Sequence, residues 1–132
     1  MTKEGAGRPP IRLLVVDDTD HVRKMLVDIL TLHGFEIAGQ ASDGEEAVTR
    51  AGEVDPHIVV MDLKMPGSDG LEAARLIRER HPGQHVILYS AYVDAAVEAR
   101  ARDIGVAVCV QKTAGVEALA REISAVAMNL GR

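Results

Sequence analysis

The stretch that decides the fold is Val59-Val60-Met61-Asp62-Leu63-Lys64-Met65-Pro66-Gly67-Ser68-Asp69-Gly70. An apolar run ends abruptly in the carboxylate of Asp62, and a loop that contains a proline and two glycines follows at once. A continuous apolar run of this length is typical of a strand that is covered on both faces of a sheet. The pattern therefore predicts a buried strand that delivers Asp62 to the edge of the sheet, where loops and ligands meet.

Outward from this stretch, strand-like apolar runs alternate with segments of helical periodicity. The predicted strands cover residues 11–16, 35–41, 57–61, 85–89 and 106–110, and the predicted helices cover 19–33, 45–51, 70–80, 94–103 and 116–130. Strands that alternate with helices through short connections form parallel βαβ units. We therefore expect an α/β fold with a doubly wound, five-stranded parallel sheet.

Composition narrows the class of protein. A chain of 132 residues suits one domain, which we place at residues 11–130 after a flexible leader over residues 1–10. The net charge of −5 argues against direct nucleic-acid binding, which needs clustered Lys and Arg. The single cysteine, Cys109, allows no internal disulfide, and no apolar run is long enough to span a membrane. These features predict a cytoplasmic protein without membrane insertion.

Five side chains with suitable chemistry stand just after four of the predicted strands. Asp17 and Asp18 follow the first strand, Asp62 the third, Ser90 the fourth and Lys112 the fifth. In a doubly wound sheet, ligands bind beyond the carboxyl ends of the strands, at the point where the strand order reverses. We therefore expect these five residues to share one edge of the sheet.

The chemistry of this set suits phosphoryl transfer. Three converging carboxylates raise one another's pKa unless a cation intervenes, and hard oxygen ligands favour Mg²⁺ over zinc. A carboxylate such as Asp62 can accept a phosphoryl group as an aspartyl phosphate. The Ser90 hydroxyl and the Lys112 ammonium can each contact a phosphoryl oxygen, and transfer depends mainly on positioning and charge neutralisation.

The chain resembles the receiver domain of two-component response regulators over about residues 11–130. The matching features are Val15-Val16-Asp17-Asp18, Ala41-Ser42-Asp43-Gly44-Glu45-Glu46-Ala47, Met61 to Gly70, Tyr89-Ser90-Ala91 and Gln111-Lys112. The resemblance implies a (βα)5 flavodoxin-like receiver fold with strand order 2-1-3-4-5, and a single-domain regulator similar to the chemotaxis regulators. It also implies a signalling domain, not an enzyme, that catalyses only its own phosphorylation and dephosphorylation.

The resemblance assigns a role to each site residue. Asp62 would be the phosphoacceptor, supplied by a histidine kinase, a phosphotransfer protein or a small phosphodonor. Asp18 and Asp62 would bind Mg²⁺ directly, Asp17 mainly through water, and the backbone carbonyl of Lys64 would complete the shell. Ser90 would swing toward the phosphoryl group and Lys112 would pair with it. Phosphorylation would then control contacts with a target protein, or a homodimer, through the face formed by residues 94–103, 106–110 and 116–130.

Two positions depart from the family pattern. Cys109 stands three residues before Lys112, where the family usually has an aromatic residue whose rotation reports phosphorylation. Thr113 stands where a proline usually follows the lysine through a cis bond, and a cis bond to a non-proline residue costs about 3 kcal/mol, so we expect a trans bond. Tyr92 is our hypothesis for the moving aromatic residue.

Other interpretations remain for single residues and for the whole chain. Asp17-Asp18 alone, or Asp69, could simply cap a helix, and Cys109 could be an inert core thiol. A Mg²⁺-dependent phosphatase would need a general acid and a second Asp at the position of Lys64. A flavin carrier would need a hydroxyl-rich phosphate loop where this chain has Asp-Asp-Thr-Asp. The chain could also be the regulatory part of a longer transcription factor.

Overall fold

The predicted alternation of strands and helices is present in a computed structural model, which describes residues 9–65 and 67–130. The helices are α1 (Asp20–Leu32), α2 (Gly44–Val54), α3 (Gly70–Arg80), α4 (Ala95–Ile104) and α5 (Gly115–Met128), with a 3-10 turn η1 (Lys112–Ala114) before α5. The strands are β1 (Arg12–Val16), β2 (Glu36–Ala41), β3 (Ile58–Met61), β4 (Lys64–Met65), β5 (Ser68–Asp69), β6 (His85–Ser90) and β7 (Val108–Gln111). The predicted leader lies outside the described residues except for Pro9 and Pro10, which are exposed.

Five of these strands form one parallel sheet in the order β2-β1-β3-β6-β7. Counted along the chain without the short β4 and β5, this is the predicted order 2-1-3-4-5, so the fold class is confirmed. β1 and β3 lie in the middle of the sheet, and all four residues of β3 are buried. Both faces of these strands are covered, which agrees with their apolar sequences over residues 13–16 of β1 and 58–61 of β3.

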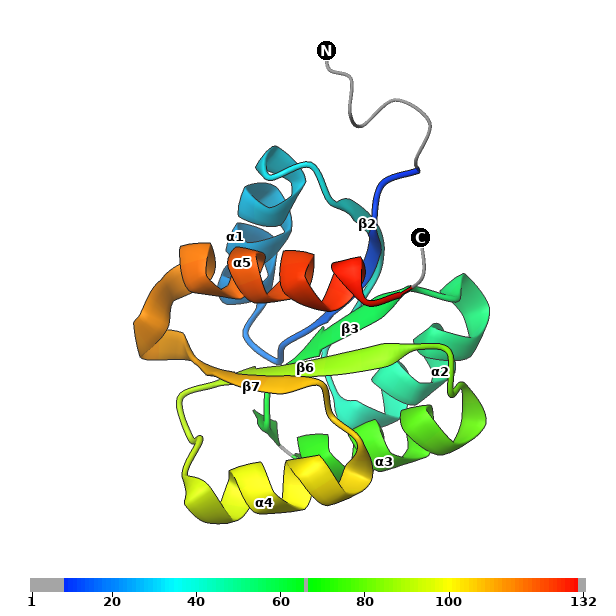
Figure 1. Cartoon of the computed structure of the whole chain (residues 1–132), viewed down its shortest axis with the longest axis vertical. Coiled ribbons are helices and arrows are strands. Elements are labelled where there is room, and N and C mark those ends of the chain that lie inside the picture. The colour runs from blue at the N-terminus through cyan, green and yellow to red at the C-terminus, as the bar shows by residue number, and fades with distance from the viewer. Residues whose placement is uncertain (1–8, 66, 131–132) are drawn as a thin grey trace.

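Helices cover the sheet on both faces (Figure 1). One core lies between the sheet and α1 and α5, and its largest fully buried side chains are Leu13, Leu26, Leu30, Ile58, Ile87, Leu119 and Ile123. The other lies between the sheet and α2, α3 and α4, and includes Leu14, Met61, Leu71, Ile77 and Leu88. With so few aromatic residues in the chain, both cores are essentially aliphatic.

Aspartates begin three of the helices. The side chains of Asp43, Asp69 and Asp94 accept hydrogen bonds from backbone N–H groups in the first turns of α2, α3 and α4. These bonds satisfy donors that a helix start leaves unpaired, and they confirm Asp69 as a cap. α1 differs from these three helices, because Thr19 occupies its N-cap position but the Thr19 side chain makes no capping hydrogen bond.

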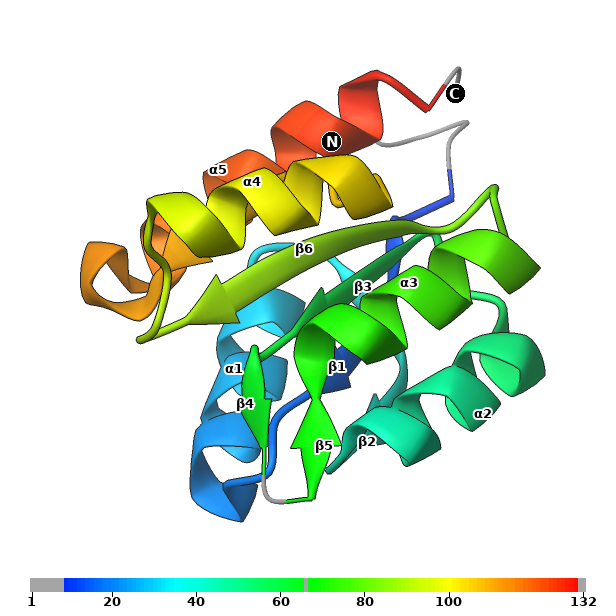
Figure 2. The same ribbon diagram turned by 90° about the horizontal axis from the view of Figure 1, so that it is seen from below.

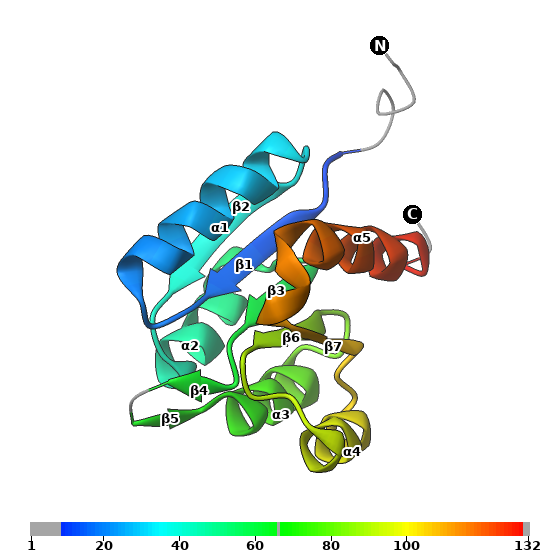
Figure 3. The same cartoon turned by 90° about the vertical axis from the view of Figure 1, so that its left-hand side faces the viewer.

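The main difference from the sequence prediction follows Asp62. The segment predicted as a loop contains β4 and β5, which pair antiparallel, Lys64 with Asp69 and Met65 with Ser68. This small hairpin lies beside the start of α3 (Figures 2 and 3). Strands of two residues are too short to show an alternating pattern, so periodicity gives no sign of them. β7 also begins two residues later than the predicted strand over 106–110.

Within residues 9–65 and 67–130, the structure contains no helix with both the length and the apolar character that a membrane span requires.

Candidate functional site

The five predicted site residues lie at the carboxyl ends of neighbouring strands. Asp17 and Asp18 directly follow β1, Asp62 follows β3, Ser90 is the last residue of β6, and Lys112 follows β7. Since β1, β3, β6 and β7 are adjacent and parallel, their carboxyl ends meet at one edge of the sheet. Register pairs β1 with β3 up to Val16 and Met61, so the carboxylates of the first and third strands leave the sheet side by side.

The three carboxylates converge. One oxygen from each of Asp17, Asp18 and Asp62 lies within 4.8 Å of the others. Asp17 is 1% exposed and Asp62 is 8% exposed, whereas Asp18 is half-buried. Three hard oxygen donors with one side open to water form a donor set that suits Mg²⁺. The residues present therefore fit a divalent cation of this kind.

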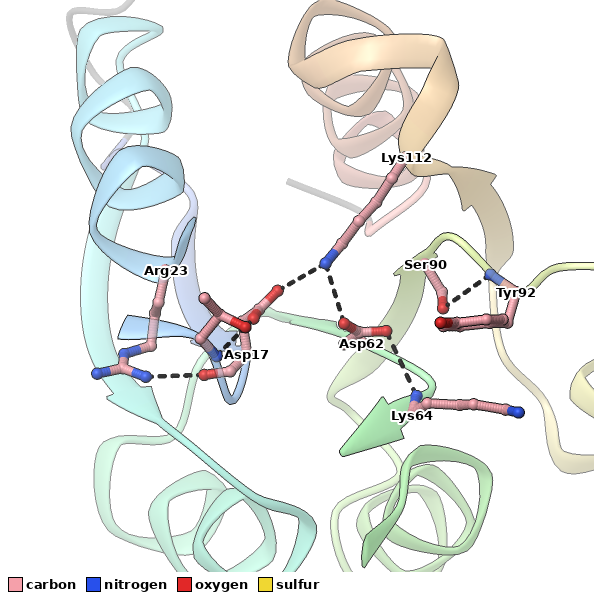
Figure 4. A network of polar contacts seen from close by, with 8 residues as sticks. Asp17, Arg23, Asp62, Lys64, Ser90, Tyr92 and Lys112 are labelled. Atoms are coloured by element: carbon pink, nitrogen blue, oxygen red, sulfur yellow. Dashed lines mark hydrogen bonds and ion pairs between the residues drawn. The ribbon is translucent and has the colours of Figure 1, made fainter. Parts of the chain in front are cut away.

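Lys112 carries the positive charge of the site. Its Nζ donates to Oδ2 of Asp17 and to Oδ2 of Asp62, each at 2.9 Å (Figure 4). Partial burial alone would lower the pKa of Lys112, but the hydrogen bonds and charges of the two aspartates outweigh burial and hold this pKa above its ordinary value. The lysine is therefore charged at neutral pH. From the end of β7 it links the two aspartates that follow β1 and β3.

Ser90 is completely buried beside the acidic cluster. Its Oγ accepts a hydrogen bond from the backbone N–H of Tyr92 at 3.2 Å, so the hydroxyl is tied to the loop between β6 and α4. Figure 4 shows Ser90 and Asp62 on the same side of the site. The expected rotation of Ser90 toward a phosphoryl group stays a prediction.

Lys64 has two different contacts. Its backbone N–H donates to Oδ1 of Asp62 at 3.4 Å, while its Nζ lies 4.7 Å from the centre of the Tyr92 ring. A cation this close to an aromatic face is attracted by the ring quadrupole. The side chains of Lys64 and Tyr92 thus join the hairpin to the β6–α4 loop. The role of the Lys64 carbonyl as a metal ligand remains a prediction.

An open pocket of about 360 Å³ gives access to the acidic cluster. It is lined by Asp18, Thr19, Asp62, Lys64, Met65 and Tyr92. A larger groove, of about 580 Å³, lies between α2 and α3, but its lining includes none of the five predicted site residues. The chemistry of its lining, not its volume, therefore marks the smaller pocket as the candidate site.

Arg23 contacts the backbone of the candidate site, although no sequence pattern indicated this residue. It lies in α1, and its Nη1 donates to the backbone carbonyl of Asp17 at 2.7 Å (Figure 4). An arginine at this helix position has no distinctive spacing relative to the carboxylates. Its partners become visible only once α1 is folded against the β1–α1 loop.

The two departures from the family pattern have structural consequences. Cys109 lies in β7, is half-buried and packs at the margin of the core that faces α2, α3 and α4, so the interpretation as a core thiol holds in part. Burial raises the pKa of this thiol, Glu98 raises it further, and Arg102 opposes them. Thr113 lies in the turn η1, and no peptide bond in the described parts of the chain is cis, as expected for a non-proline residue.

Comparisons with known proteins converge on one family. The family model of the response regulator receiver domain matches residues 13–124. The response regulator GacA of Pseudomonas protegens is 39% identical over 117 residues, which are 86% of this chain and 54% of that protein. The chemotaxis protein CheY of Thermotoga maritima is 41% identical over 97 residues, which are 70% of this chain and 81% of that protein.

Solved structures agree with the sequence matches. The structure of a CheX–CheY–BeF3–Mg²⁺ complex from Borrelia burgdorferi superimposes with a TM-score of 0.84 and 29% identity, covering 89% of this chain and 89% of that chain. GacA is longer than this chain, and the match spans about half of the length of GacA.

Proposed function

The chain belongs to the response regulator receiver domain family, and on this premise we propose that Asp62 accepts a phosphoryl group in a Mg²⁺-dependent reaction. The donor would be a histidine kinase, a phosphotransfer protein or a small phosphodonor. The observation that carries the proposal is the site itself, in which Asp62 lies within 4.8 Å of two further carboxylates and 2.9 Å from the Lys112 ammonium. The receiver domain would extend over residues 11–130, in the cytoplasm.

In the proposed step, a carboxylate oxygen of Asp62 attacks the phosphorus of the donor. A new P–O bond forms while the bond from phosphorus to the donor oxygen or imidazole nitrogen breaks, and the leaving group keeps that electron pair. Asp18, Asp62 and the Lys64 carbonyl would hold Mg²⁺, with Asp17 acting mainly through water, and the bound ion would supply neutralisation of the charge on the phosphoryl oxygens. Lys112 and Ser90 would contact the remaining phosphoryl oxygens, so that positioning and charge supply most of the catalysis.

The effect of the added phosphoryl charge would be transmitted to the surface by residues that already contact the site. Lys112 divides its hydrogen bonds between Asp17 and Asp62, so a phosphoryl group on Asp62 would compete for it. Lys112 leads directly into η1 and α5, and the Ser90–Tyr92 bond leads into α4. We propose that the α4–β7–α5 face responds and controls binding to a target protein or a second copy of the chain.

The test is phosphorylation by acetyl phosphate with Mg²⁺, followed by intact mass. Wild type is expected to gain one phosphoryl mass, and Asp62→Asn none. Asp69→Asn is the matched control, because Asp69 lies in the same stretch but caps α3, and this variant should still be phosphorylated. Equal gain by wild type and Asp62→Asn would show that Asp62 is not the acceptor.

Other outcomes would favour a different function. No phosphorylation of wild type by any donor would contradict the proposal and indicate a receiver that signals without the modification. Multiple turnover on a phosphorylated metabolite would indicate a phosphatase instead. The length of the encoding reading frame tests whether the domain controls a further attached domain, as the greater length of GacA suggests for that relative.

A further inference from the structure

We propose that Arg23 is a positioning residue of the cation site, which holds the β1–α1 loop so that Asp17 and Asp18 converge with Asp62. The proposal rests on the proposed function, since it concerns the same Mg²⁺ site. In this role Arg23 fixes the positions of the Asp17 and Asp18 carboxylates through the backbone, because its guanidinium bonds the carbonyl of Asp17 and neither carboxylate.

The guanidinium of Arg23 joins three parts of the chain. Nη1 donates to the backbone carbonyl of Asp17 at 2.7 Å, and Nε donates to Oε1 of Gln40 in β2 at 3.1 Å. Nη2 donates to Oδ1 of Asp20 at 2.8 Å. The rigid, planar fork of an arginine can make all three bonds at once, whereas a lysine ammonium would have to choose among them.

Other bonds also reach the loop, since Lys112 Nζ donates to Oδ2 of Asp17 at 2.9 Å and the backbone N–H of Arg23 donates to the Thr19 carbonyl at 2.9 Å. Among the described residues, the Arg23 guanidinium supplies the side-chain hydrogen bond to a backbone carbonyl of this loop. The backbone N–H of Asp17 donates to the Ala41 carbonyl, and that of Thr19 donates to Oδ1 of Asp17. Within the part of the chain that the structure describes, no hydrogen bond or ion pair holds the Asp18 carboxylate. The position of Asp18 therefore follows from the backbone on either side of it.

The surroundings of Arg23 suit a side chain that holds the β1–α1 loop in one position. Its side chain is only 17% exposed, although it carries a full charge, and its Gln40 partner lies near the end of the neighbouring strand β2. Partners outside a metal's own ligand shell commonly orient the ligands, and their loss costs about 10- to 100-fold in metal affinity. Arg23 holds the backbone that carries Asp17 and Asp18, which is this kind of role.

Charge and geometry make opposite predictions for this residue, which makes the proposal testable. As a nearby positive charge, Arg23 would repel Mg²⁺, so its removal would tighten binding. As a positioning residue, Arg23 holds Asp17 and Asp18 in place for the ion, so its removal would weaken Mg²⁺ binding. The sign of the change in Kd therefore separates the two roles.

The experiment is a Mg²⁺ titration of the full chain, followed by calorimetry and by the backbone amide shifts of residues 17–19 and 62. Arg23→Ala is expected to weaken Mg²⁺ binding about tenfold. Gln40→Ala removes one anchor without changing the charge and should weaken binding in the same direction, by a smaller factor. Lys24→Ala is the matched control, because it removes a positive charge from the next, exposed position of α1 and should leave Kd unchanged.

Phosphorylation by acetyl phosphate supplies a second readout. If Arg23 acts only by positioning the ligands, Arg23→Ala should need more Mg²⁺ for half-maximal rate but approach the wild-type rate at saturation. A general loss of folding would lower the rate at every Mg²⁺ concentration and would also appear in urea unfolding without Mg²⁺, which overturns the assignment.

The outcomes separate this inference from the proposed function. If wild type binds Mg²⁺ and is phosphorylated while Arg23→Ala binds Mg²⁺ equally or more tightly, the role of Arg23 is wrong and the function stands. An equal loss in Lys24→Ala also overturns it, because the weaker binding would then not depend on the contacts that Arg23 makes. If wild type binds no Mg²⁺, both the site and the role of Arg23 fail.

Discussion

Lys112 balances the charge of the acidic pocket at the scale of single residues. It pairs with two aspartates that are almost completely buried, and its own side chain is 26% exposed. Removing one partner of a buried pair leaves an uncompensated charge, which is costly. Lys112 therefore has a structural role in addition to its proposed contact with a phosphoryl group.

The raised pKa of Lys112 predicts how stability changes with pH. Below the ordinary lysine pKa of about 10.4, Lys112 is charged in both the folded and unfolded states and its contribution is complete. As pH rises through the higher folded pKa, the unfolded chain loses its proton first, so the free energy of unfolding falls. Urea unfolding from about pH 8 to about pH 11 should show this decline in wild type.

Lys112→Met is the control for this pH dependence. It keeps a long side chain but has no titrating charge, so it should be less stable than wild type at neutral pH and show a shallower alkaline decline. Equal pH dependence of the two proteins would show that the two ion pairs do not contribute.

Gly70 fits closely against the backbone that carries Asp62. A Cβ added there would lie 2.9 Å from the Cα and carbonyl oxygen of Leu63 and closer still to the Asp62 carbonyl. Overpacking of this kind costs typically about 1–3 kcal/mol, so Gly70→Ala should lower the free energy of unfolding by that amount. It should also slow phosphorylation, because Asp62 must move.

Urea unfolding measures this effect, and Gly83→Ala is its control. A Cβ at Gly83 meets nothing within 4 Å, and this residue has no positive φ. The control should change stability by less than about 0.5 kcal/mol. A similar change in both variants would mean that the close approach at Gly70 is not the cause.

At the scale of secondary structure elements, strand β4 and the β6–α4 loop both line the pocket, through Lys64 and Met65 on one side and Tyr92 on the other. The contact between Lys64 and the Tyr92 ring joins these two elements across the opening. The side chain of Tyr92 is exposed, and its backbone N–H donates to the Ser90 hydroxyl. The hypothesis that Tyr92 replaces the usual aromatic residue near Cys109 is consistent with these contacts and stays a prediction.

Tyr92 should slow hydrolysis of the proposed aspartyl phosphate by limiting the approach of water. Tyr92→Ala is expected to shorten the lifetime about two- to fivefold, the factor that matches about 0.5–1 kcal/mol for an exposed cation–π contact. Tyr92→Phe keeps the ring and should keep the lifetime. Loss of phosphate after removal of the donor, followed by intact mass, measures this. A wild-type half-life of seconds, or equal lifetimes in all three proteins, would contradict it.

At the scale of the whole molecule, the sheet order brings β1 and β3 together in the middle and places their carboxylates at one edge. Helix layers on both faces fix the strands, so the acidic cluster is held by the complete fold (Figure 1). Three carboxylates held together repel one another in the folded state and separate in the unfolded chain. A cation that binds only the folded cluster should therefore stabilise the entire domain.

Thermal unfolding with and without Mg²⁺ tests this coupling. At a Mg²⁺ concentration ten times Kd, wild type should gain about 1.4 kcal/mol, and a chelator should remove the gain. Asp18→Asn should abolish most of the effect. Asp28→Asn, on the exposed side of α1, should retain it. A gain that survives in Asp18→Asn would place the ion elsewhere.

The sequence by itself determined the alternation of strands and helices and the strand ends that carry Asp17, Asp18, Asp62, Ser90 and Lys112. These features depend on local periodicity and on the rule that ligands gather at the carboxyl edge of a parallel sheet. The strand order came from the family motifs, and the structure confirms it.

Only the tertiary structure decided which side chains meet. Lys112 bonds Asp17 across 95 positions of sequence, and Arg23 bonds Gln40 across 17. The Lys64–Tyr92 contact and the two-residue strands β4 and β5 likewise leave no periodic trace. Such contacts depend on how separate elements pack, and a local pattern contains no information about a partner on another element.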